Sequence, residues 1–252
     1  MGLVRDRQAP ERKSFQDEQL CFGTAASSHL LPEVLLMMPR LFPWTHAPRV
    51  LLTMLGLAFS IDSGFAVEPI TLVVVEEDWE LIVASPDPNS TAPQISCTIS
   101  PLSHVNSIHA AFELNHQSQP EFTAGGLQLQ IWNDEQPLGS RKFPNPGVLS
   151  TDGEVVRWTQ SLSLAGGVLT FAIKDGSSTT WGDFGGQGYL NASLVTDLPN
   201  LNGYDPAISA KNSGVAYAGN RVTSLILKRV RATLSNGEVV EDPTERVVHI
   251  HN

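Results

Sequence analysis

Cysteine is scarce in this sequence: of the two cysteines in 252 residues, only Cys97 follows the first 66 residues. A disulfide-stapled scaffold is therefore excluded for residues 67–252, because a single thiol has no internal partner. The apolar neighbours of Cys97 indicate a small buried side chain rather than a catalytic thiol. Basic residues are also few, 16 against 26 acidic ones, and the net charge of -10 argues against general binding to nucleic acid.

The short motifs that identify common enzyme classes are also missing from the sequence. It contains no Gly-rich phosphate-binding loop, no Gly-x-Ser-x-Gly elbow, no His-Glu-x-x-His, no EF-hand loop and no Cys-x-x-Cys pair. This does not exclude an enzyme, but it removes the mechanisms that a single sequence can reveal. We therefore predict no organic cofactor and expect binding rather than catalysis.

Long hydrophobic runs are missing as well. The longest run in the N-terminal third, Val50 to Ile61, has 12 residues and would rise about 18 Å as a helix, against a bilayer core of roughly 30 Å. Arg49 precedes this run and small residues follow it up to Ala66, a pattern typical of a secretory signal peptide. We therefore expect a signal peptide over residues 37–66 and a secreted, periplasmic or cell-surface protein, with no transmembrane segment in the mature chain.

The segment before this signal peptide has no clear hydrophobic period. Met37 and Met38 stand where an initiator is expected, so residues 1–36 are predicted to be an over-extended gene start or a disordered leader. Residues 1–66 contain six basic and six acidic residues, so the whole net charge of -10 belongs to residues 67–252. A buried N-terminal helix is the alternative for the apolar run.

Alternation of apolar and polar residues recurs in the rest of the chain and predicts β-strands. Residues 107–116 show it clearly, with apolar side chains at every second position. Residues 155–174 show it on both sides of a Gly-Gly pair, which predicts a β-hairpin. The Asn-Gly pair at residues 236–237 predicts another hairpin, because this dipeptide favours the positive φ angles of tight turns.

Charged residues interrupt this pattern at two places. Within the long β-rich run Val222 to Leu234, Lys228 falls on the apolar side and predicts a bulge or the point where the strand leaves the core. The acidic cluster Glu76 to Asp78 separates two further strand candidates, residues 70–75 and 79–83, and is predicted to be a solvated turn.

Around ten short strands, with turn residues between them and no helical period of three turns, predict an all-β fold. The predicted architecture is a two-sheet antiparallel sandwich, jelly-roll or lectin-like, after the N-terminal signal segment. We expect a single β-sandwich domain over residues 67–252, because no internal repeat or linker divides this region. Two tandem smaller sandwiches are the alternative.

Two loops rich in Gly, Asp, Asn and aromatic residues, residues 175–189 and 200–205, provide the candidate ligand site. Sugars are bound by aromatic rings that stack on C–H bonds and by carboxylate or amide groups that bind hydroxyls, and both loops contain such groups. The alternative is that their aromatic side chains pack in the core. The candidate ligand-binding residues are Trp181, Asp183, Asn202, Tyr204 and Asp205.

The same loops offer candidate ligands for a structural calcium ion, because carboxylates and backbone carbonyls are the oxygen ligands that Ca²⁺ prefers. The candidates are Asp175, Asp183 and Asp205, although their spacing matches no known calcium loop. The sequence predicts no other metal site.

Glu113 is the candidate catalytic residue, because it lies in the middle of a predicted strand on the polar face. A glycosidase needs two carboxylates about 5 to 10 Å apart. The positions two and four residues after Glu113 hold Asn115 and Gln117, so the second acid is missing there. The alternative is a solvated outer face of the sandwich.

Together these patterns predict an exported β-sandwich protein that acts as a non-enzymatic carbohydrate-binding or surface and adhesion module. The partner would be a carbohydrate or another surface protein. A glycan-active hydrolase or lyase with a lectin-like fold is the first alternative. A structural cell-surface component with a protein partner is the second.

Overall fold

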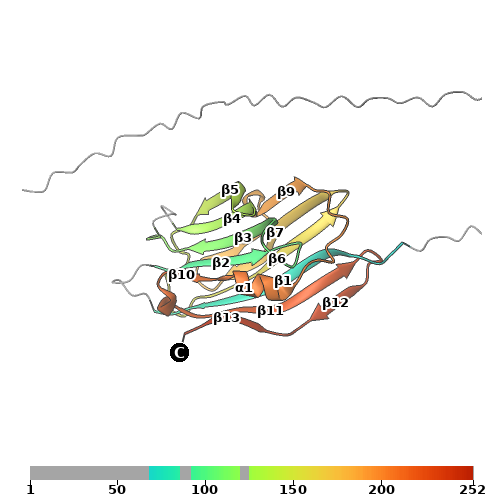
Figure 1. Ribbon diagram of the computed structural model, residues 1–252. Helices are drawn as coiled ribbons and strands as arrows, with labels where there is room; N and C mark the ends of the chain where they lie inside the picture. The colour runs from blue at the N-terminus through green and yellow to red at the C-terminus, as the bar shows by residue number, and fades with distance from the viewer. Residues whose placement is uncertain (1–67, 86–91, 120–124, 252) are drawn as a thin grey trace, which may run out of the picture. The chain divides into compact units, whose positions relative to one another are not determined.

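The computed structural model describes residues 68–85, 92–119 and 125–251 (Figure 1). The leader and signal peptide predicted for residues 1–36 and 37–66 lie outside these ranges. Within the ranges described, no helix combines the length and the apolar character that crossing a membrane requires.

The described chain forms two antiparallel β-sheets that pack face to face, which confirms the predicted all-β sandwich (Figure 1). The eight-stranded sheet has the order β12-β11-β1-β6-β7-β8, with β13 paired to β11 and β9 paired to β7. The five-stranded sheet has the order β10-β2-β3-β4-β5. One α-helix, α1 (Pro206–Asn212), lies against β2, and two short 3-10 helices are η1 (Gly188–Leu190) and η2 (Gly219–Arg221).

The strands of each sheet have the following bounds. The eight-stranded sheet contains β1 (Leu72–Val83), β6 (Val155–Ala165), β7 (Val168–Ser178), β8 (Gly182–Phe184), β9 (Asn191–Val195), β11 (Val222–Leu234), β12 (Val239–Asp242) and β13 (Arg246–Ile250). The five-stranded sheet contains β2 (Gln94–Ile99), β3 (Ile108–Asn115), β4 (Gly126–Asn133), β5 (Gln136–Pro144) and β10 (Gly214–Ala216).

The core lies between the two sheets and uses every second residue of the central strands. Trp79 of β1 and Trp158 of β6 are cross-strand partners whose parallel rings lie 6.3 Å apart. Phe112 of β3 meets Trp158 edge-on from the opposite sheet, with ring centroids 5.6 Å apart. Burial of each such side chain contributes roughly 1.5–3 kcal/mol, so this aromatic cluster helps to hold the two sheets together.

Both predicted hairpins are present. Gly166 and Gly167 link β6 to β7 with φ angles of 57° and 75°, which is the two-residue turn that suits the twist of the strands. The turn between β11 and β12 is longer. Its glycine, Gly237, has a φ of 86°, and the Gly237 N–H donates to the Leu234 carbonyl at 2.9 Å.

The turn predicted at Glu76 to Asp78 is wrong, because β1 runs without a break through all three acids. Strand alternation places Glu77 in the core, whereas Glu76 and Asp78 point outward, where arginines of β11 neutralise them. The bulge predicted at Lys228 is confirmed: Asp78 pairs with Arg229 and Trp79 with Leu227, so Lys228 is the extra residue.

Candidate functional site

The first loop of the predicted ligand site is anchored to the protein interior. Trp181 packs against Phe184, with ring centroids 4.9 Å apart, and its indole N–H donates to the carboxylate of Glu154. Glu154 is fully buried, and burial raises the pKa of its carboxyl, while hydrogen bonds from Trp181 and Ser178 oppose the shift. Asp183 is exposed on β8. Trp181 therefore has a structural role, as the donor to a buried acid.

The second loop of the predicted ligand site is also used for structure. Tyr204 donates its hydroxyl to Glu77 Oε1 at 2.7 Å, and Asp205 caps α1 by accepting from the Ala207 N–H at 2.8 Å. Asn202 Oδ1 accepts from the N–H of Leu72, the first residue of β1, at 2.7 Å. These contacts attach the loop to α1 and to the beginning of β1.

The structure does not bring the two loops together. Glu154, the partner of Trp181, accepts through its backbone carbonyl from the N–H of Val83, at the end of β1. Asn202 binds Leu72 at the other end of this 12-residue strand, and such a strand spans about 36 Å when each residue rises about 3 Å. Binding of a ligand by the loop residues stays a prediction, and the two groups would have to act separately.

The calcium candidates are likewise dispersed. Asp183 lies on β8 beside Trp181, whereas Asp205 caps α1. Asp175 lines a hollow on the outer face of the eight-stranded sheet. Across residues 68–85, 92–119 and 125–251, no three His, Cys, Asp or Glu side chains are grouped so that they could hold a metal ion.

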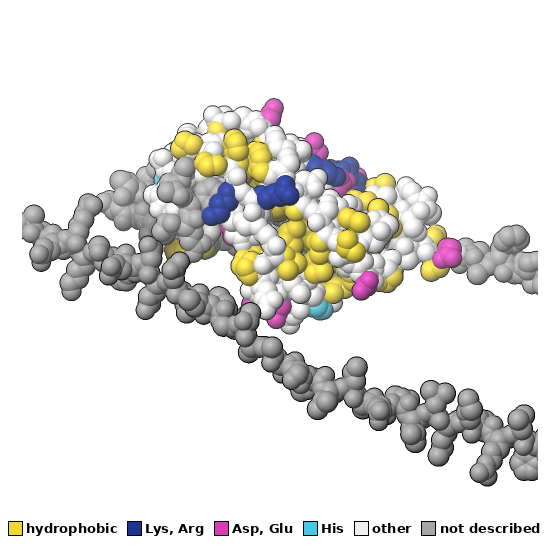
Figure 2. Space-filling view, turned by 90° about the horizontal axis from the view of Figure 1, so that it is seen from above, with side chains coloured by type: hydrophobic (Ala, Val, Ile, Leu, Met, Phe, Trp, Pro, Cys, Tyr) yellow, Lys and Arg dark blue, Asp and Glu magenta, His cyan; other side chains and the backbone are white. Residues whose placement is uncertain are grey.

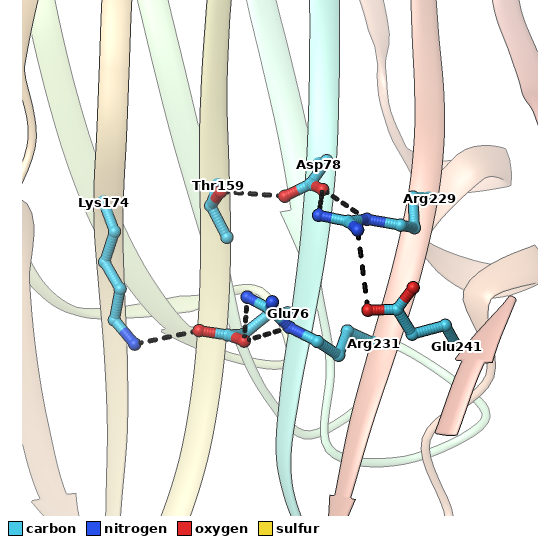
Figure 3. A network of polar contacts seen from close by, with 7 residues as sticks. All are labelled: Glu76, Asp78, Thr159, Lys174, Arg229, Arg231 and Glu241. Carbon is cyan, nitrogen blue, oxygen red and sulfur yellow. Dashed lines mark hydrogen bonds and ion pairs between the residues drawn. The ribbon is translucent and has the colours of Figure 1, made fainter. Parts of the chain in front are cut away.

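That outer face contains the main network of ion pairs, which we call the charge lattice (Figure 3). Glu76 of β1 lies 2.6 Å from Arg231 of β11 and 3.3 Å from Lys174 of β7. Asp78 lies 2.7 Å from Arg229 and accepts a hydrogen bond from Thr159 at 2.8 Å, and Arg229 in turn lies 3.5 Å from Glu241. A hollow of about 480 Å³ opens over this face. Because the acids of β1 already face cations, the charge lattice is better suited to stability than to binding a charged ligand.

The outer face of the five-stranded sheet differs, because its side chains are mostly uncharged and polar. We call it the polar face; it comprises Ser96, His109, Glu113, Gln128, Gln130, Trp132, Ser140 and Lys142. Glu113 points away from the core, since its neighbours Phe112 and Leu114 are fully buried. The strand register places Ser96, Glu113, Gln128 and Lys142 in one row across four adjacent strands.

A chain of hydrogen bonds orients the polar face. The Trp132 indole N–H donates to Gln130 Oε1 at 2.9 Å, and Gln130 Nε2 donates to Glu113 Oε2 at 2.9 Å. An indole N–H can only donate, so the Gln130 amide must turn its oxygen to Trp132 and its NH₂ group to Glu113. Gln128, the cross-strand neighbour of Glu113, donates through Nε2 to Ser140. The side chains of Trp132, Gln130 and Glu113 therefore have fixed orientations relative to one another before any ligand binds.

Burial adds to this arrangement. Gln128 is only 6% exposed although it faces away from the core, and Ala111, the cross-strand neighbour of Gln130, is 8% exposed. Glu113, Gln130 and Trp132 are partly exposed. The polar face is therefore a sheltered surface with an aromatic ring, two amides and a carboxylate within reach of one ligand.

Sequence reasoning identified Glu113 as a candidate but did not connect it with Gln130 and Trp132. Its strand was predicted correctly, but the neighbours of Glu113 depend on the register between β3 and β4. The alternation of Gln128, Gln130 and Trp132 with buried apolar residues is the signal that could have found them.

A second carboxylate, that of Glu77 in β1, is fully buried on the core side of the strand. Burial raises the pKa of Glu77 from its usual 4.5 to about 7, while hydrogen bonds from Tyr204 and Trp79 and the charge of Arg246 oppose the shift. The Trp79 indole donates to Oε2 at 3.1 Å and Tyr204 donates to Oε1. Because Glu77 has no access to solvent, it is a structural acid in this conformation rather than part of a site.

Comparison with known proteins gives no family. No protein-family model and no curated protein sequence matches the chain. A solved structure that does match is that of SCP-B, described as a member of the eqolisin family of peptidases in a complex with the tripeptide Ala-Ile-His. The match has 13% sequence identity and a TM-score of 0.27, and it covers 71% of this chain and 84% of that chain. Such a likeness assigns neither a fold family nor an activity to this protein.

Proposed function

We propose that this protein is a non-enzymatic carbohydrate-binding module whose site is the polar face of the five-stranded sheet. The observation that supports this most directly is the hydrogen-bonded chain from Trp132 through Gln130 to Glu113. It presents an aromatic ring beside an oriented amide and a carboxylate, which are the groups that a sugar ring and its hydroxyls require.

The roles of the residues follow from their chemistry. The face of the Trp132 ring stacks on the C–H face of a pyranose, while Glu113 accepts hydrogen bonds from two vicinal hydroxyls. Lys142, at the edge of the same row, donates to a further sugar oxygen. Because the side chains are already fixed, little conformational entropy is lost when the sugar binds.

The same face argues against a hydrolase. Strands β2, β3, β4 and β5 contain no Asp or Glu other than Glu113. Hydrolysis of a glycosidic bond needs a second carboxylate about 5 to 10 Å away, as acid, base or nucleophile. A carboxylate that an amide orients is suited to accepting hydrogen bonds from sugar hydroxyls.

A glycan array tests the proposal. The full chain should bind a subset of glycans, and Trp132→Ala should weaken binding at least ten-fold, about 1.4 kcal/mol or more, because the stacking surface is lost. Trp132→Phe keeps an aromatic ring but loses the donor to Gln130, so an intermediate loss is expected. Trp181→Phe is the matched control from the loop site, and it should leave glycan binding unchanged.

Three results would contradict the proposal. The first is an array without bound glycan at the highest soluble protein concentration. The second is glycan binding that is lost in Trp181→Phe but kept in Trp132→Ala, which would move the site to the predicted loops. The third is release of reducing ends from a polysaccharide that Glu113→Gln abolishes, which would make the protein a hydrolase.

A further inference from the structure

The rim of the sandwich that carries β5 and β9 is open. Three hollows follow one another along β9 and the residues after it: about 410 Å³ at residues 191–193, about 260 Å³ at residues 192–194 and about 450 Å³ at residues 195–198. Consecutive residues of a strand point to opposite faces, so hollows lined by consecutive residues lie along the edge of the strand. The edge of β9 that faces away from β7 has no paired strand among the described residues, and the hollow at residues 192–194 lies between this edge and β5.

In the part of the chain that the structure describes, β9 pairs only with β7 and β5 pairs only with β4, so each has one unpaired edge. An unpaired edge offers a row of backbone donors and acceptors to another strand, and most proteins protect such edges with Pro, Lys or other charges. The edge of β5 is protected in this way by Pro137, Pro144, Arg141 and Lys142. By contrast, β9 has the sequence Asn-Ala-Ser-Leu-Val, which contains neither a charge nor a proline.

Apolar side chains accompany the unprotected edge. Val195 is 84% exposed and Leu138, which lines the neighbouring hollow, is 53% exposed. Figure 2, which looks down on this rim, shows hydrophobic side chains gathered beside basic ones. Exposed apolar groups next to a free strand edge are typical of a surface that is covered by a partner.

A charge of opposite sign lies near each end of β9. Arg141 of β5 donates to the carbonyl of Gly188, three residues before β9 begins, at 2.8 Å. Asp197 lies two residues after β9 ends and lines the last hollow. Within residues 68–85, 92–119 and 125–251, neither forms an ion pair with an oppositely charged side chain.

We propose that β9 is the interface of a two-fold symmetric dimer, in which it pairs antiparallel with β9 of a second copy. Most homodimers have a two-fold axis, and a strand that pairs with itself across such an axis is antiparallel. With the axis at Ser193, Leu194 faces Ala192 of the partner subunit and Val195 faces Asn191 of the partner subunit. A large side chain thus meets a smaller one on each face.

The same two-fold axis also brings the charges of Arg141 and Asp197 close to each other. Asp197, two residues beyond β9, comes opposite position 189 of the partner, immediately beside the Gly188 carbonyl that holds Arg141. Each dimer therefore contains two Arg141–Asp197 contacts, one at either end of the paired strands. Because both copies contribute, every substitution in this interface acts twice.

Sedimentation velocity of the full chain over a range of concentrations tests the proposal. We expect a monomer–dimer equilibrium. Val195→Lys should raise its dissociation constant at least ten-fold, because it removes the apolar contact with Asn191 of the partner subunit and places a lysine at each end of the paired strands. The matched control is Val239→Lys on β12, an edge strand on the other side of the same sheet where Val239 is 50% exposed; it should leave the equilibrium unchanged.

A charge exchange tests the geometry. Arg141→Glu and Asp197→Lys should each weaken the dimer at least ten-fold, because each places like charges together. The double variant should regain most of the affinity. The proposal is overturned if the chain is monomeric at its highest soluble concentration, if Val239→Lys dissociates the dimer as well as Val195→Lys, or if the double variant does not recover. None of these results depends on the polar face, whose binding to glycans is measured separately.

Discussion

Replacing the buried Glu77 by glutamine should remove the loss of stability that ionisation of this carboxyl causes as pH rises. The carboxyl of Glu77 is fully buried, and its pKa is raised from 4.5 to about 7, chiefly by burial. The native state therefore binds the proton more tightly than the unfolded chain does. As pH rises from about 4.5 to about 7, the free energy of unfolding must fall, because the native state has to accept a buried charge.

The expected magnitude follows from the shift. A pKa that moves from 4.5 to about 7 costs the native state about 3 kcal/mol once both states are ionised. Glutamine removes this cost, but it can offer only one acceptor oxygen, and Glu77 uses both, one for Tyr204 and one for Trp79. The mismatch costs about 1 kcal/mol at any pH. Glu77→Gln should thus be about 1 kcal/mol less stable than the natural protein near pH 4 and about 2 kcal/mol more stable near pH 8.

Urea unfolding followed by tryptophan fluorescence measures this difference, because Trp79 and Trp158 are buried beside one another in the core. Other groups also titrate in this range, so the informative quantity is the difference between the two proteins at each pH, provided that their m-values agree. A difference that stays constant within about 0.5 kcal/mol between pH 4 and pH 8 would refute the reasoning. So would a variant that becomes relatively less stable as pH rises.

Two further substitutions test other parts of the structure. Trp181→Phe removes a hydrogen-bond donor to the buried Glu154, so the free energy of unfolding should fall by about 1–3 kcal/mol. The loss should be larger at pH 8 than at pH 5, because the ionised carboxylate depends most on the donor. Equal losses at the two pH values in urea unfolding would contradict this role. Arg231→Gln should lower the free energy of unfolding by up to about 1 kcal/mol in dilute buffer and by less in 1 M NaCl, because the ion pair of Arg231 with Glu76 is partly exposed and is screened by salt. Thermal unfolding in which salt does not reduce the difference in melting temperature between the variant and the natural protein would refute the electrostatic explanation.

The all-β fold could be predicted because alternation and turn residues are local properties of the chain. The hairpin at Gly166 and Gly167 needs only positive φ angles, which glycine adopts without cost. The failure at Glu76 to Asp78 has an equally physical cause. A sequence of three successive acids resembles a solvated turn when their partners are not known. The partners of the two outer acids, Arg229 and Arg231, lie about 150 residues further along the chain.

The candidate site could be predicted only in part. Glu113 was identified because the alternation of apolar and polar residues shows that it lies on the polar side of a strand. Its connection to Gln130 and Trp132 is not, since a shift of one residue between β3 and β4 would place these side chains on the opposite face. The loop residues Trp181 and Tyr204 were predicted to bind a ligand because they lie among glycines, yet both donate hydrogen bonds to buried carboxylates. Composition shows which groups are present, whereas contacts decide whether they are free.

The distribution of charge links the acidic composition to the proposed interface. Residues 67–252 contain ten basic residues, and six of them form ion pairs with six acids among the described residues, three of these bases within the charge lattice. These pairs cancel, so the net charge of -10 comes from the other four basic and 14 acidic residues. The four other basic residues are Arg141, Lys142, Lys211 and Arg221, of which Arg221 is buried.

Two of these four, Arg141 and Lys142, lie together on β5, beside the open edge of β9. Two copies of an acidic protein repel each other least where their local charge is least negative. Arg141 makes the rim that carries β5 and β9 less negative, which would lower the electrostatic cost of the approach of a second copy in the proposed dimer. Six of the ten basic residues of residues 67–252 already form ion pairs elsewhere in the sandwich, whereas Arg141 on this rim forms none with a described acid and is available to Asp197 of the partner subunit in the proposed dimer.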